Sequence, residues 1–87
     1  MTAELHYIPA GGALAACWRL VIWDGAHIRD VYECATYRTL RGIAKSSGFA
    51  MPTELRAKRA LTDWENMVLA GKTCDTMFKM EIPAIQH

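Results

Sequence analysis

The chain has 87 residues, 52% of them hydrophobic, and a net charge of +1. This length and composition fit one compact domain over residues 1–87 with a single small core, and they exclude both a disordered chain and a large enzyme with separate lid and cofactor domains. Residues 1–18 lack the charged start and long apolar middle of a secretory signal, and no apolar run reaches the roughly 20 residues of a membrane helix, so we expect a soluble cytoplasmic protein without a membrane partner.

Two strands are expected in the first part of the chain. Residues 5–9, LHYIP, predict a short strand that ends at Pro9, because proline has no N–H for the strand ladder. The AGGA stretch that follows is typical of a loop. Residues 17–23 alternate with the period of two that predicts a second strand.

A third strand is expected after a tight turn. Asp24 and Gly25 form a dipeptide that is favoured in two-residue type I′ hairpin turns. The register set by this turn gives three cross-strand pairs: Arg19 with Asp30, Val21 with Ile28, and Trp18 with Val31. The alternative is a longer turn that includes Ala26 and His27, which places Cys17 opposite Cys34.

Two helices are expected in the second half of the chain. Thr36 is a suitable N-cap for a helix over residues 37–47, and Gly48 suits the left-handed position after its end. A second helix is expected over residues 53–70, with Gly71 in the same role.

The final strand is expected within TMFKMEIP, residues 76–83, where apolar and charged residues alternate. The order along the chain is therefore β-β-β-α-α-β. This order predicts the α+β class, as a small, mostly antiparallel sheet with two helices packed on one face. Leu61, Trp64 and Val68 are expected to pack the second helix onto the sheet.

No residue pattern predicts catalysis or a bound metal. Zinc sites and disulfide frameworks need closely spaced, repeated cysteines and histidines. The chain offers only scattered potential ligands: His6, His27, His87, Cys17, Cys34 and Cys74. We expect reduced, mostly buried cysteines and a protein that is not an enzyme and has no metal or cofactor.

Positive charge is concentrated in one segment. Residues 38–59 contain six basic residues and one acidic residue, whereas the rest of the chain is net acidic. On the first helix the basic residues follow helical spacing and form a stripe beside the packed face: Arg38, Arg41 and Lys45. Arg56 and Arg59 repeat this spacing on the second helix, so the charges merge into one patch if the helices lie side by side. The alternative is an ordinary solvated helix face.

The hairpin of residues 17–34 is apolar on both faces. In the expected register one face holds Trp18, Leu20, Ile22 and Val31. The other face holds Cys17, Val21, Trp23, Ile28 and Tyr32. A solvated sheet face should be polar, so Trp23 and Tyr32 are candidates for contact with a partner. The alternative is that residues 5–16, LHYIPAGGALAA, fold over this face.

These features favour a small non-enzymatic module that binds the acidic surface of another protein through the basic helix face, the hairpin aromatics, or both. Such chains are common among adaptors and among inhibitors encoded by phages and mobile elements, including anti-CRISPR proteins. The alternative is a nucleic-acid-binding regulatory protein that uses the basic segment 38–59, although the low net charge is untypical of that class. Two further alternatives are a small subunit of an obligate complex and a homodimer.

Overall fold

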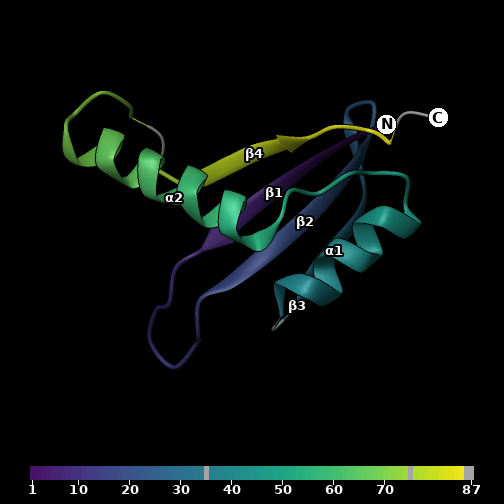
Figure 1. Ribbon diagram of the computed structural model, residues 1–87, viewed down its shortest axis with the longest axis horizontal. Coiled ribbons are helices and arrows are strands. Elements are labelled where there is room, and N and C mark those ends of the chain that lie inside the picture. Colours follow the sequence, from purple (N-terminus) through teal and green to yellow (C-terminus); the bar gives the residue numbers. More distant parts are fainter. Residues whose placement is uncertain (35, 75, 86–87) are drawn as a thin grey trace.

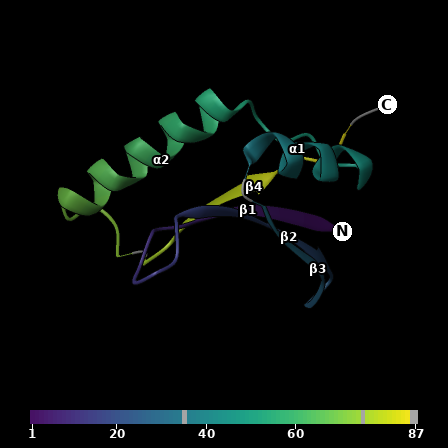
Figure 2. The same ribbon diagram turned by 90° about the horizontal axis from the view of Figure 1, so that it is seen from below.

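The computed structural model describes residues 1–34, 36–74 and 76–85, with six elements in the order β-β-β-α-α-β (Figure 1). They are β1 (Thr2–Ile8), β2 (Cys17–Asp24), β3 (His27–Cys34), α1 (Tyr37–Ser46), α2 (Glu54–Leu69) and β4 (Phe78–Ile82). The strands form one antiparallel sheet in the order β3-β2-β1-β4, and both helices lie on the same side of it (Figure 2). The predicted α+β class and element order are confirmed.

β1 is an inner strand that pairs with β2 on one side and with β4 on the other. Leu5, which lies opposite both Leu20 and Met80, is fully buried. β1 begins at Thr2, before the predicted start at residue 5. Pairing along both of its edges explains the longer strand, because these ladders are contacts with distant residues that the local sequence does not reveal.

The hairpin of β2 and β3 follows the alternative register next to the turn and neither predicted register beyond it. Asp24 lies opposite His27, so the two-residue loop is Gly25-Ala26, and only Gly25 has a positive φ, of 62°. An irregularity between Ile22 and Trp23 then shifts the register again, as a β-bulge does. The pairs beyond it are Arg19 with Glu33, Val21 with Val31, Leu20 with Tyr32, and Trp18 with Cys34.

The apolar pattern accounts for the observed register. The predicted turn would place Arg29 opposite Leu20, on the helix-covered face, whereas the observed register places Tyr32 there. Tyr32 packs against the core and Val31 is exposed, so the predicted faces of these two residues were reversed. Arg19 still finds an acidic partner across the strands, because its guanidinium lies 2.6 Å from the Glu33 carboxylate.

The core lies between the helices and the covered face of the sheet. α1 contributes three buried residues, Tyr37, Leu40 and Ala44, at helical spacing. Trp18 on β2 packs edge-on against Tyr37, with ring centroids 5.4 Å apart. These contacts fix α1 over the sheet and leave its opposite side free for solvent.

α2 is held mainly through its first half. Ala57 is fully buried, while Leu61 and Trp64 are half-buried against the core. The predicted packing of Val68 is wrong, because 38% of this residue is exposed. The C-terminal part of α2 extends past the end of the sheet, where no strand lies beneath it (Figures 1 and 2). Neither helix of the described chain is long and apolar enough to cross a membrane.

The second face of the sheet is not covered by the segment proposed to fold over it. Residues 5–8 belong to β1, and residues 9–16 form an exposed loop. This face displays Ile28 and Val31, which are 54% and 49% exposed, beside the half-buried Trp23. The structure therefore has one face packed under helices and one open face.

Candidate binding site on the basic helix face

α1 begins and ends where its sequence supplies caps. Thr36 accepts a hydrogen bond from a main-chain N–H of the first turn through its hydroxyl, and Gly48, with a φ of 89°, follows the last turn. With one side of the helix buried, helical spacing places three basic residues on the exposed side: Arg38, Arg41 and Lys45.

The segment after α1 folds back beside the helix. Three main-chain hydrogen bonds of 2.9 Å hold it: the Phe49 N–H to the Ala44 carbonyl, the Ala50 N–H to the Pro83 carbonyl, and the Ile85 N–H to the Gly48 carbonyl. Near α2 the Tyr37 hydroxyl donates to the Pro52 carbonyl at 2.8 Å. Residues 48–52 are thereby fixed between α1 and the segment that follows β4.

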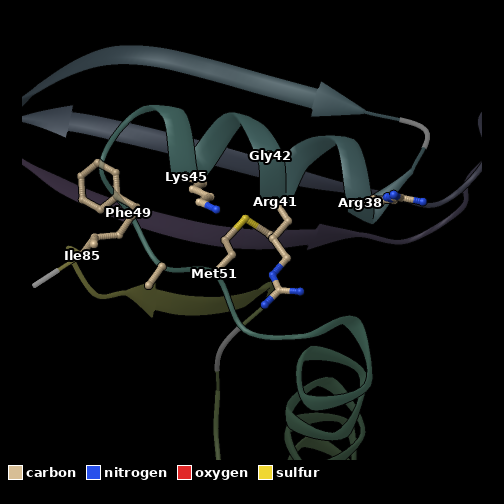
Figure 3. A pocket seen from close by; sticks show the side chains of 8 residues that line it. Arg38, Arg41, Gly42, Lys45, Phe49, Met51 and Ile85 are labelled. Carbon is tan, nitrogen blue, oxygen red and sulfur yellow. The ribbon is translucent and has the colours of Figure 1, made fainter.

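A hollow of about 490 Å³ lies between α1 and this segment, and we call it the α1 hollow. Its lining residues are Arg38, Arg41, Gly42, Lys45, Phe49, Ala50, Met51 and Ile85. Arg41 and Lys45 point from the helix towards Met51, whereas Arg38 points away from the centre (Figure 3). Among the residues that the structure describes, three cations and no acidic side chain line the α1 hollow.

A second hollow, of about 720 Å³, adjoins the first, and we call it the α2 hollow. Arg56 and Arg59 line it together with two acidic residues, Asp63 and Glu81. Ala50 and Met51 line both hollows. The cations of the two helices therefore lie around neighbouring hollows that differ in charge, and the α1 hollow is the more strongly positive.

The basic residues of the two helices were expected to form one patch if the helices lay side by side. The helices do not lie side by side. They approach each other at their N-terminal ends, where Tyr37 contacts Pro52, and they diverge from there (Figures 1 and 2). The space between these ends is a third hollow of about 640 Å³, which Arg38 also lines, together with Glu54 and Lys58.

The five predicted basic residues of the site share one electrostatic property: within the described ranges, none of their side chains forms an ion pair or hydrogen bond. They are Arg38, Arg41, Lys45, Arg56 and Arg59, and all five are exposed. Lys58, by contrast, lies 3.4 Å from the Glu54 carboxylate one helical turn away.

Tyr37 at the edge of this site has a strongly perturbed hydroxyl. Burial raises the pKa of Tyr37 to about 12, the positive charge of Arg41 opposes this rise, and the Glu54 carboxylate adds to it. The phenol therefore stays protonated and keeps its hydrogen bond to the Pro52 carbonyl well into alkaline solution.

The two predicted hairpin aromatics lie on opposite faces of the sheet. Trp23 is half-buried on the open face, and its indole Nε1 is buried without a hydrogen-bond partner in the described structure. Tyr32 packs against the core on the covered face. The structure therefore brings neither of them together with the basic residues of α1 and α2.

Sequence reasoning found the cations of the site but missed the residues that shape it. Phe49, Met51 and Ile85 become lining residues only because residues 48–52 fold back, which no local pattern indicates. Gly42 was detectable, because glycine is unfavourable in a helix interior and this one lies within the basic stripe.

The described residues contain no group of three or more His, Cys, Asp or Glu side chains that could hold a metal. His6 is buried, with Nε2 3.4 Å from the Glu4 carboxylate. Cys17 is half-buried but Cys74 is exposed, against the expectation of mostly buried cysteines. His87 and the side chain of Cys34 lie outside what the structure describes. Comparison with family models, with curated proteins and with solved structures finds no match to this chain.

Proposed function

We propose that this protein is a small non-enzymatic binding module that docks on an acidic surface of another protein. One observation carries the proposal: among the described residues, the α1 hollow is lined by three exposed cations and by no acidic side chain. An adaptor or an inhibitor of the kind encoded by phages and mobile elements is the role we expect for such a module.

The unpaired state of these cations supports this proposal. An exposed basic residue on a helix commonly gains a few tenths of a kcal/mol from an acidic residue one turn away. Lys58 has such a neighbour in Glu54, but the five cations of the site have no ion pair among the described residues. A positive face of this kind attracts a negative surface and accelerates the encounter between the two proteins.

The surroundings of the cations favour a protein partner over a nucleic acid. Proteins that bind single strands use exposed aromatic side chains on which bases stack. Among the described residues that line the α1 and α2 hollows, the one aromatic is Phe49, and it is only 4% exposed. Ile85, which is half-buried at the rim of the α1 hollow, instead offers an apolar contact for the side chains of a protein.

The test uses reversal of charge on the basic face. A variant that combines Arg38→Glu, Arg41→Glu and Arg59→Glu leaves the buried face of each helix unchanged, so it is expected to fold. The matched control combines Arg29→Glu, Lys72→Glu and Lys79→Glu, which changes the net charge equally at exposed positions away from the α1 and α2 hollows. Each protein is immobilised and exposed to a nuclease-treated lysate, and association with any retained protein is then measured by surface plasmon resonance.

We expect a partner that the wild type and the control retain and that associates with the reversed variant about tenfold more slowly or worse. Equal binding of this partner to all three proteins would show that the basic face is only solvated. Binding of the wild type to random duplex or single-stranded oligonucleotides, with an affinity that falls steeply as salt rises, would instead establish the nucleic-acid alternative.

A further inference from the structure

Gly42 lines the α1 hollow, and neither the backbone nor the packing at this position requires a glycine. It lies in the interior of α1, where glycine is among the least favourable residues. Its backbone does not require glycine, because the positive φ angles of the described chain are at Gly12, Gly25, Gly48 and Gly71. Packing does not require it either, because a Cβ at this position would meet no atom within 4 Å.

The position of Gly42 relates it to the unpaired cations. It follows Arg38 by one helical turn and precedes Lys45 by one turn, so it lies between them on the helix surface. A glycine here leaves the helix backbone bare at the wall of the α1 hollow. Glycine commonly occupies positions where another chain or a ligand approaches the backbone closely.

We propose that the α1 hollow binds an acidic peptide segment of the partner, with the main chain of that segment against Gly42 and its carboxylates on Arg41 and Lys45. This inference rests on the proposed function and adds the form of the ligand and its point of closest approach. Arg38, at the outer edge of the α1 hollow, attracts the flanking acidic residues of the same segment.

Charge complementarity identifies the occupant. Of the residues that the structure describes, three basic and no acidic ones line the α1 hollow, whereas Asp63 and Glu81 equal in number the two cations of the α2 hollow. The remaining lining is uncharged; Phe49 and Met51 are buried, whereas Ile85 is half-buried and can contact an apolar side chain. A segment that carries glutamates or aspartates around one apolar residue matches both the cations and this lining.

The experiment measures binding of a short fluorescein-labelled peptide that carries glutamates around one leucine. A second peptide with glutamine at each glutamate position controls for charge. The proteins are the wild type, Gly42→Leu, which fills the α1 hollow without altering charge, and Thr39→Leu, which adds the same side chain at an exposed position of α1 outside the lining. Fluorescence anisotropy gives each dissociation constant.

We expect the wild type to prefer the glutamate peptide, Gly42→Leu to bind it at least about tenfold more weakly, and Thr39→Leu to stay within about twofold of the wild type. Equal affinity of the wild type for the two peptides, or unchanged affinity of Gly42→Leu, overturns the inference. Should Gly42→Leu fail to fold, amide chemical shifts of the wild type decide. Shifts on peptide addition at residues 41–45 and 49–51 support the site, and shifts confined to other regions overturn it.

The two proposals fail in distinguishable ways. If a captured partner loses affinity for the charge-reversed variant but not for Gly42→Leu, the acidic protein surface stands and the peptide bound at Gly42 does not. If the charge reversal itself has no effect on that partner, the proposed function fails, and with it the inference that depends on it.

Discussion

Tyr37 joins three parts of the molecule through a single side chain. Its ring packs on Trp18 of the sheet, it belongs to the first turn of α1, and its hydroxyl donates to the Pro52 carbonyl just before α2. Because the wall of the α1 hollow depends on residues 48–52, this hydrogen bond links the core to the shape of the candidate site.

Replacement of Tyr37 by phenylalanine is expected to lower the free energy of unfolding at neutral pH by about 1 kcal/mol, because the buried ring stays in place and the Pro52 carbonyl loses its donor. The wild type should lose this advantage in alkaline solution. The pKa of Tyr37 is about 12 in the folded protein and about 10 when unfolded, so the proton-linked stability is complete below pH 10 and falls as the pH rises towards 12.

Urea unfolding of both proteins at several pH values measures this difference. The stability of the wild type relative to Tyr37→Phe should fall by up to about 2–3 kcal/mol between pH 10 and pH 12. Subtracting the variant removes the titration of lysines and other tyrosines. A relative stability that does not change over this range would contradict a raised pKa at Tyr37.

The two helices could be predicted because the residues that begin and end them are their neighbours in the sequence. Thr36 caps α1 as predicted, Thr53 caps α2 although it was expected to be the first residue of that helix, and Gly48 and Gly71 follow the two helices with positive φ. The hairpin was predicted only in outline, because its register depends on the bulge beside Ile22. That bulge reflects how Tyr32 packs under the helices, which is a contact between distant parts of the chain.

The attachment of α2 is expected to depend on Trp64 and not on Val68. Trp64 is half-buried, with its ring centroid 6.1 Å from that of Phe78, so Trp64→Ala should lower the free energy of unfolding by about 2 kcal/mol, less than the 3–5 kcal/mol typical of a fully buried tryptophan. Val68→Ala should change it by no more than about 0.5 kcal/mol, because Val68 is exposed beyond the sheet. Thermal and urea unfolding compare the two variants, and equal losses would contradict this placement of α2.

The sheet has one face without a helical layer. The cations of the candidate site were predictable from composition and spacing, but the α1 hollow was not, because it forms where residues 48–52 meet residues 83–85. The open face was predicted to be apolar, but it is so only in part: Val31 and not Tyr32 lies on it, and so does the ion pair of Arg19 with Glu33. Exposed apolar residues on a sheet are typical of an interface.

We expect this open face to produce self-association that depends on concentration. Ile28 and Val31 are about half exposed beside Trp23, and covering them with a second copy would remove apolar surface from water. Sedimentation equilibrium of the wild type should show a dimer that dissociates on dilution, and Val31→Lys should shift it to monomer. Thr39→Lys, on the opposite side of the sheet, is the control. A wild type that is monomeric at every concentration would contradict the prediction.

The pairing of β1 with β4 has a consequence for folding during synthesis. Ala3 lies opposite Ile82, so β1 is synthesised well before the strand that completes the sheet. Contacts between such distant residues form slowly, because chain entropy is lost before they stabilise the fold. Meanwhile the free edge of β1 presents N–H and C=O groups that can pair with other chains. This edge of β1 is therefore covered only after residues 78–82 have been synthesised, when the short strand β4 becomes the edge of the sheet.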